Sequence, residues 1–217
     1  MLEAVIFDFD GVIADTPKYY FRHMKEYLKE LHTEVTDEDI SLLVGHSFHE
    51  EFGYLNKKYN LDVSLEKFVE EVSVPARKEM SEELVIDVHL KKLLFELKQD
   101  NIPMAIASTN VLKNISFVIE KFEIQDYFEG IITAQDIEKF KPFPDAYLKA
   151  IEIIGKNPGN CVAIEDTLIG VQSAQRAGLK AVAIPNKFTS NQDFSESNMI
   201  INNFSELDLE IVKRLVE

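Results

Sequence analysis

The sequence predicts an α/β protein: a parallel sheet flanked by helices, with an all-helical module inserted after the first strand. Short, near-continuous apolar runs recur along the chain, as in strands that are buried on both faces of a parallel sheet. Segments with helical periodicity lie between most of these runs. One long stretch near the N-terminus carries helical patterns and no convincing strand.

Six apolar runs predict the strands of the sheet, because each is short and rich in β-branched residues. They cover residues 4–7, 104–107, 130–133, 161–164, 181–184 and 199–201. Apolar residues spaced as on one face of a helix predict helices over residues 88–98 and 111–122. The Ser- and Asn-rich stretch 186–198 predicts a surface loop.

The inserted module begins at Thr16 and Pro17, which are typical of a helix N-cap followed by proline at the first helical position. Helical patterns then cover residues 18–31, 36–44, 49–59 and 64–80. A block of this length is too long for a crossover loop. We therefore expect a helical cap domain over residues 16–80 and an α/β core built from residues 1–15 and 81–217.

Composition narrows the class of protein. The chain has 217 residues, which suits one α/β core with an inserted module. Its net charge is 23 − 38 = −15, and such an acidic balance disfavours nucleic-acid binding and docking on anionic membranes. No apolar stretch approaches the roughly 20 residues that cross a bilayer.

The single cysteine, Cys161, excludes an intramolecular disulfide and a cysteine-based zinc cluster. It lies in an apolar run without a basic neighbour, so we expect a buried, unreactive thiol. The first residues lack the basic leader of a signal peptide, and we expect a cytoplasmic protein. Nothing in the sequence requires an obligate partner, so we expect a monomer.

Polar side chains follow three of the expected strands at the points where each strand ends. They are Asp8 and Asp10 after the first strand, Ser108, Thr109 and Asn110 after the second, and Glu165 and Asp166 after the fourth. Lys141 precedes the helix that leads into the fourth strand. Ligands of open parallel sheets bind outside the carboxyl ends of the strands, so we expect these residues in one site.

Four converging carboxylates need a compensating cation. Two like charges 4 Å apart repel by about 4 kcal/mol at an effective dielectric constant of 20. Mg²⁺ suits a few carboxylates combined with substrate phosphate. The polar groups of Ser108 and Asn110, the charge of Lys141 and nearby backbone N–H groups suit phosphate oxygens. These residues together indicate phosphoryl transfer.

Four segments of the chain resemble the motifs of the haloacid dehalogenase (HAD) superfamily. The first motif is similar to Asp8-Phe9-Asp10-Gly11-Val12, the second to Ser108, the third to Lys141-Pro142 with Asp145, and the fourth to Glu165-Asp166. The stretch 165–178 resembles the β-phosphoglucomutase-like branch. The resemblance implies a HAD-like Rossmannoid core, with the helical insertion as its cap.

The resemblance also implies a role for each matched residue. Asp8 is the expected nucleophile, which forms an aspartyl-phosphate, and Asp10 the general acid and then base. Mg²⁺ is the implied cofactor, held by Asp8, the backbone carbonyl of Asp10 and Asp166, with Glu165 in or just behind the first shell. The expected phosphate-binding residues are Ser108, Thr109, Asn110 and Lys141.

Several residues of the insertion are expected to face the substrate. They are Thr16 at its hinge, Tyr20 in its first helix, and Gly45, His46 and Ser47 between its second and third helices. For Thr16, capping of its own helix is an equally open interpretation.

The resulting functional prediction is the Mg²⁺-dependent hydrolysis of a small phosphate monoester, for example a sugar phosphate. The first alternative is a β-phosphoglucomutase-like sugar phosphomutase. Mutases of that type hold a second phosphate with basic cap residues, but residues 43–48 contain no Lys or Arg. Tyr20 also stands where the family usually has histidine. The second alternative is a protein that only binds a phosphorylated ligand, although the presence of Asp8 counts against it.

Overall fold

The computed structural model describes residues 1–217 and contains one parallel six-stranded sheet in the order β3-β2-β1-β4-β5-β6. The strands are β1 (Ala4–Phe7), β2 (Met104–Ala107), β3 (Gly130–Ile132), β4 (Cys161–Glu165), β5 (Lys180–Ala183) and β6 (Met199–Ile200). All six expected strands are confirmed, with ends that differ by at most one residue. β1 pairs with both β2 and β4. The chain runs outward from β1 through β2 to β3, returns to β4 on the other side of β1, and continues outward through β5 to β6.

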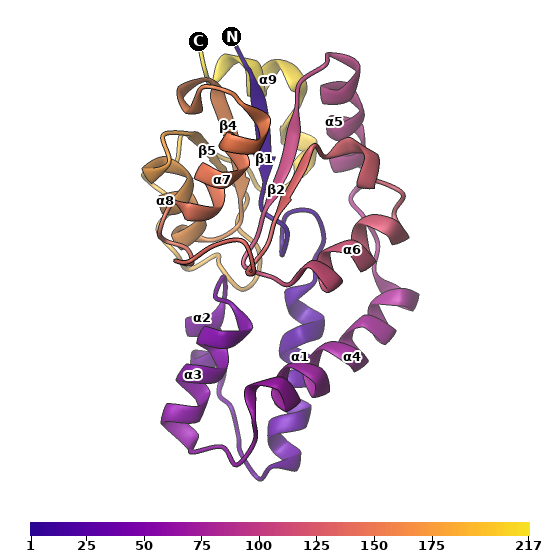
Figure 1. The fold of residues 1–217 in the computed structure, drawn as a ribbon, viewed down its shortest axis with the longest axis vertical. Helices are drawn as coiled ribbons and strands as arrows, with labels where there is room; N and C mark the ends of the chain where they lie inside the picture. The colour runs from indigo at the N-terminus through magenta and orange to yellow at the C-terminus, as the bar shows by residue number, and fades with distance from the viewer.

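Helices cover both faces of the sheet (Figure 1). They are α5 (Val88–Gln99), α6 (Leu112–Lys121), α7 (Asp145–Ile154), α8 (Leu168–Arg176) and α9 (Leu209–Arg214), with short 3₁₀ turns at Gln125–Tyr127, Pro158–Asn160 and Phe204–Glu206. Alternate residues of β1 point to opposite faces: Val5 belongs to the core under α5, α6 and α9, and Ile6 to the core under α7 and α8. Both faces are therefore buried, as the continuous apolar runs predict.

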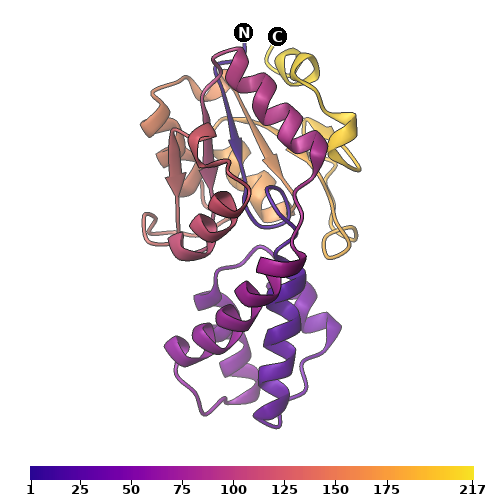
Figure 2. The ribbon, with the colours of Figure 1, turned by 90° about the vertical axis from the view of Figure 1, so that its right-hand side faces the viewer.

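The insertion forms a helical lobe beside the carboxyl ends of the strands (Figures 1 and 2). Its helices are α1 (Pro17–Glu30), α2 (Asp37–Leu43), α3 (Phe48–Tyr59) and α4 (Leu65–Glu83). The last helix extends three residues beyond the expected boundary at residue 80. The division into a cap domain and an α/β core stays a prediction. None of the helices combines the length and apolar character that a bilayer span requires.

Thr16 stands at the start of α1, but its side chain makes no capping hydrogen bond. Its hydroxyl instead donates to Asp10 Oδ1 at 2.5 Å. The expectation that Thr16 caps its helix is therefore wrong, and the hydroxyl is directed toward the candidate site. Pro17 at the first helical position lacks an N–H, which reduces the need for a cap there.

Asp39 ties α2 to α3 within the lobe. Its fully buried carboxylate accepts hydrogen bonds from Tyr54 Oη at 2.8 Å, Lys58 Nζ at 2.5 Å and Tyr59 Oη at 2.6 Å. It also accepts from the backbone N–H of Thr36, which completes the capping box of α2. Burial raises the pKa of Asp39, but these hydrogen bonds outweigh it and lower the pKa below its usual range.

We expect Asp39→Ala to lower the free energy of unfolding at neutral pH by about 2 kcal/mol, because both the cap and the hydrogen bonds to α3 disappear. A depressed pKa in the folded state stabilises the protein above the unfolded value of about 4 and loses that contribution in acid. The difference between wild type and variant, measured by urea unfolding, should shrink below about pH 4. A difference that stays constant down to pH 3 contradicts this account.

Candidate active site

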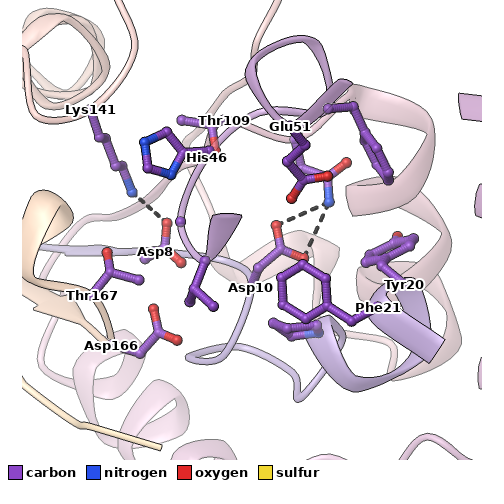
Figure 3. Close-up of a pocket in the computed structure, with 15 residues that line it drawn as sticks. Asp8, Asp10, Tyr20, Phe21, His46, Glu51, Thr109, Lys141, Asp166 and Thr167 are labelled. Carbon is purple, nitrogen blue, oxygen red and sulfur yellow. Dashed lines mark hydrogen bonds and ion pairs between the residues drawn. The ribbon is translucent and has the colours of Figure 1, made fainter. Parts of the chain in front are cut away.

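A pocket lies between the carboxyl ends of the strands and the helical lobe, and its space, with the open mouth included, measures about 610 Å³ (Figure 3). From the α/β part come Asp8, Asp10, Thr109, Asn110, Lys141, Asp166 and Thr167. From the lobe come Pro17, Tyr20, Phe21, Val44, Gly45, His46, Phe48 and Glu51. The sheet edge and the insertion therefore share one cavity, as the strand-end residues predict.

Asp8 follows β1 and lies 6 % exposed at the floor of the pocket. The ammonium of Lys141 forms ion pairs with Asp8 and with Glu165, and it donates to the carbonyl oxygen of Ala107 at 3.0 Å. Burial raises the pKa of Asp8 although Lys141 opposes the shift. Burial lowers the pKa of Lys141, but the two carboxylates outweigh it and raise the pKa. Lys141 is thus a fixed cation between two buried acids.

Asp10 occupies a different environment from Asp8. Besides Thr16, the amide nitrogen of Asn110 contacts its two carboxylate oxygens at 3.2 and 3.0 Å. The amide oxygen of Asn110 accepts from Asn114 Nδ2 at 2.8 Å, which fixes the orientation of the amide. Burial raises the pKa of Asp10, and Thr16 and Asn110 oppose it. Burial raises the pKa of Asp8 as well, so the two acids differ in their hydrogen-bond partners and not in the direction of the pKa shift.

Asp8, Glu165 and Asp166 offer oxygen atoms that lie within 4.8 Å of one another. Oδ1 of Asp166 is buried without a hydrogen-bond partner, and burial with the charges of Asp8 and Glu165 raises the pKa of Asp166 well above its usual range. The three carboxyl groups offer only oxygen ligands, and burial together with their mutual repulsion disfavours their charged forms. A hard divalent cation such as Mg²⁺ suits such a cluster. Glu165 Oε1 is already engaged by Lys141 and Tyr147, which places Glu165 behind the other two acids.

The loop after β1 passes very close to Asp166. Gly11 adopts a φ of +89°, and a Cβ at this position would lie 2.0 Å from Asp166 Oδ2. Only glycine combines this backbone conformation with the approach to the carboxylate. Gly11 therefore allows the Asp8–Asp10 loop and Asp166 to share one site.

Asn186 is a partner of this cluster that sequence analysis missed. Its amide nitrogen donates to Asp166 Oδ2 at 2.6 Å, so it fixes the carboxylate while Oδ1 stays free. The residue lies in the segment expected to be an ordinary surface loop, and no local motif distinguishes it. Only the fold brings the chain after β5 back to the end of β4.

If the acidic cluster holds Mg²⁺, we expect Asn186→Ala to raise the half-saturating Mg²⁺ concentration by roughly 10- to 100-fold, as losses of groups that orient metal ligands do. Isothermal titration calorimetry with Mg²⁺ measures this shift. The number of Mg²⁺ ions bound per chain at saturation should stay that of the wild type. The exposed Asn191→Ala serves as the matched control. An unchanged half-saturating Mg²⁺ concentration in Asn186→Ala contradicts the orienting role.

The other predicted residues differ in where they lie relative to the pocket. Tyr20, Gly45, His46 and Thr109 line the pocket, as expected. Ser108 lies buried beneath it, where its hydroxyl accepts from the N–H of Asn110 at 3.0 Å. The amide of Asn110 contacts Asp10, and its role in phosphate binding stays a prediction.

Ser47 requires a correction. It does not line the pocket; its hydroxyl caps α3 in a capping box with Glu50. The spacing Ser-x-x-Glu in the sequence is the signature of this arrangement. That signal favours a helix start over a substrate contact.

Further pocket residues escaped the sequence analysis because they carry no motif. Phe21, Phe48 and Glu51 face the cavity from α1 and α3, and Thr167 faces it from the end of β4. Outside the lining, Tyr147 of α7 donates its hydroxyl to Glu165 at 2.7 Å. The periodicity of apolar residues predicts that α1 and α3 each have an apolar face. It does not predict which residues of these helices face the α/β core.

Cys161 begins β4 and is fully buried, as expected, and it does not line the pocket. Burial raises the pKa of its thiol to about 11. Nucleophilic reactions of cysteine need the thiolate. Cys161 is therefore a structural side chain of the sheet.

Comparison with known proteins decides the family. The family model described as "Haloacid dehalogenase-like hydrolase" matches residues 5–184. The chain belongs to this family. The match includes all four motif segments and the insertion, which confirms the resemblance and the HAD-like fold class.

Relatives within the family agree with a phosphatase-type enzyme. The protein named "Putative phosphatase YhcW" of Bacillus subtilis (strain 168) is 30% identical over 216 residues, which cover 98% of this chain and 96% of that protein. β-Phosphoglucomutase of the same organism is 29% identical over 235 residues, with 97% and 94% covered. The crystal structure of CbbY from Rhodobacter sphaeroides, in complex with phosphate, superposes with a TM-score of 0.90 at 25% identity, covering 98% of this chain and 99% of that one. This HAD-family protein is an enzyme of phosphoryl transfer. Its cluster of Asp8, Glu165 and Asp166 could hold a metal ion.

Proposed function

We propose that this enzyme hydrolyses a small phosphate monoester in two steps, through an aspartyl-phosphate on Asp8, with Mg²⁺ as its metal. One observation carries the proposal. Two carboxylates two residues apart share one pocket in different settings: Asp8 pairs with Lys141, and Asp10 is held by Thr16 and Asn110. Pairs of acids in different environments can divide the roles of nucleophile and proton donor.

In the first step, an Asp8 carboxylate oxygen attacks phosphorus and the bond between phosphorus and the ester oxygen breaks. The proton of Asp10 passes to the departing alkoxide, which leaves as an alcohol. Thr16 and Asn110 keep the carboxyl of Asp10 in place for this transfer. A covalent carboxylate intermediate divides one difficult displacement into two easier ones.

In the second step, a water molecule attacks phosphorus and the bond to Asp8 breaks. Asp10, now a carboxylate, accepts the proton of the water, so that phosphate leaves and both acids return to their starting states. Lys141 stays beside Asp8 and neutralises charge on the phosphoryl oxygens. Asp8 and Asp166 would hold Mg²⁺, with Glu165 behind them, and Mg²⁺ would supply further neutralisation of phosphoryl charge.

A phosphomutase of the β-phosphoglucomutase type is the second candidate, because a protein of that name is 29% identical to this chain. Such an enzyme must also hold a second phosphate. The lobe residues that line the pocket include no Lys or Arg. This composition favours release of phosphate to water over transfer to a second site on a sugar.

The test of the proposed function is phosphate release from a panel of small phosphate monoesters with Mg²⁺, with EDTA, and with EDTA followed by excess Mg²⁺. We expect release from some esters, loss of nearly all of it in EDTA, and recovery when Mg²⁺ is restored. The overall charge of −15 repels a dianionic substrate, so the local cations must overcome it. Release that continues unchanged in EDTA would contradict the metal-dependent mechanism. Conversion of a sugar phosphate into its isomer without release would favour the mutase.

A further inference from the structure

We propose that Glu51 selects the leaving group of the substrate: it accepts a hydrogen bond from a hydroxyl or ammonium group and excludes a second phosphate or a carboxylate. The inference rests on the proposed phosphatase function and adds the substrate class. That class is the monophosphate of a short polyol or amino alcohol.

Glu51 lies in the first turns of α3 and lines the pocket from the helical lobe. Glu51 is 7 % exposed, and its carboxylate makes no hydrogen bond or ion pair within the protein. Figure 3 shows the carboxylate directed into the cavity, on the same side as Asp10. A buried acid without a partner is unusual in a folded protein and points to a ligand group that completes it.

Two further unpartnered polar atoms share this wall. The hydroxyl of Tyr20 and Nδ1 of His46 are buried, and neither has a hydrogen-bond partner. An ionised carboxylate accepts hydrogen bonds, and a protonated carboxyl group or a tyrosine hydroxyl can both donate and accept them. A leaving group with one or two hydroxyls matches such a mixed set, because each hydroxyl is also both donor and acceptor.

The charges on this wall disfavour an anionic leaving group. Lys141 is the only Lys or Arg that lines the pocket, and Asp8 and Glu165 already engage it. Burial raises the pKa of Glu51, and the negative charge of Asp10 raises it further. A second phosphate would bring more negative charge to a site that already destabilises its own carboxylates.

Aromatic rings enclose the space beside Glu51. Tyr20 and Phe48 meet edge to face with ring centroids 5.4 Å apart, and Phe21 also lines the cavity. Such rings suit the C–H groups of a short carbon chain and also attract an ammonium group through their π faces. A substrate with a hydroxyl group and a substrate with an ammonium group therefore both suit this part of the pocket, because each can donate a hydrogen bond to Glu51.

The test compares kcat/KM for four three-carbon phosphate esters: glycerol 3-phosphate, its amine analogue serinol phosphate, propyl phosphate and 3-phosphoglycerate. Glycerol 3-phosphate and 3-phosphoglycerate differ by a hydroxymethyl group in place of a carboxylate. We expect the wild type to prefer the glycerol and serinol esters over 3-phosphoglycerate by at least about tenfold, with propyl phosphate below the donors. Glu51→Lys should shift the ratio of 3-phosphoglycerate to glycerol 3-phosphate at least about tenfold toward the carboxylate ester.

Glu51→Gln keeps the shape of the side chain and removes its charge. We expect it to lose any preference for serinol phosphate over glycerol 3-phosphate while it still hydrolyses the glycerol ester. Glu82→Gln, at an exposed position of α4, is the matched control and should keep the wild-type order of substrates. Thermal unfolding shows whether each variant is folded.

The failures are distinguishable. A wild-type enzyme that releases phosphate from none of the four esters counts against the proposed function and overturns this inference with it. Release without the expected order, or an order that survives unchanged in folded Glu51→Lys, overturns the role of Glu51 and leaves the phosphatase function intact.

Discussion

Asp8→Asn is expected to lower the rate of phosphate release by roughly 10³-fold or more, because the amide cannot attack phosphorus. The loss should appear in kcat, since Lys141 and the other groups that hold the phosphoryl remain. The fold should remain as well. Burial raises the pKa of Asp8, which means that the folded protein destabilises the carboxylate, so a neutral amide costs little.

Two measurements separate this chemical effect from a structural one. Thermal unfolding of Asp8→Asn without metal should occur at or above the temperature of the wild type. Acid-quenched wild type that has reacted with substrate should carry the extra mass of one phosphoryl group, and Asp8→Asn should not. Phosphorylated Asp8→Asn protein, or full activity in this variant, would show that another residue is the nucleophile.

Lys141→Met is expected to destabilise the metal-free protein by about 3–5 kcal/mol, because Asp8 and Glu165 lose the cation that they share. Lys141 is only 4 % exposed, so water cannot replace the ammonium without opening the site. The rate of phosphate release should also fall, by roughly 10²- to 10³-fold, since a charge beside the phosphoryl group is lost.

Mg²⁺ provides the internal control for Lys141→Met. If the three acids form the metal site, Mg²⁺ should raise the unfolding temperature of this variant more than that of the wild type. It should not restore the rate, because the ammonium group beside Asp8 is still missing. Lys139→Met, two residues earlier at an exposed position, should match the wild type in both measurements. A Lys141→Met protein that is as stable as the wild type without metal contradicts the role of Lys141 as the shared cation.

Local signals in the sequence predict the sheet and the floor of the pocket. The apolar runs end in polar residues at positions such as Asp8 and Asp166, and parallel strands bring their carboxyl ends to one edge. The position of a polar residue directly after a strand is then enough to predict that it lies in the site. The helices of the insertion are predicted equally well, because their apolar periodicity is local.

Other residues of the site could not be predicted in the same way. Glu51 and Asn186 become functional candidates only through packing between distant segments, and neither lies in a recognisable motif. Thr16 shows the opposite limitation: its sequence context favours a cap, but tertiary structure gives its hydroxyl to Asp10. Helix-capping propensity describes the contacts of a residue with its neighbours in the sequence. The tertiary structure decides which hydrogen-bond partner its side chain has.

The buried thiol of Cys161 makes the chain its own reporter of unfolding. It is the only cysteine, it sits at the start of the central strand β4, and its raised pKa keeps it protonated at neutral pH. An alkylating reagent can therefore label the protein only when β4 becomes exposed to solvent. The labelling rate measures how often the centre of the sheet opens, without an engineered probe, and a ligand that stabilises the folded protein should slow it.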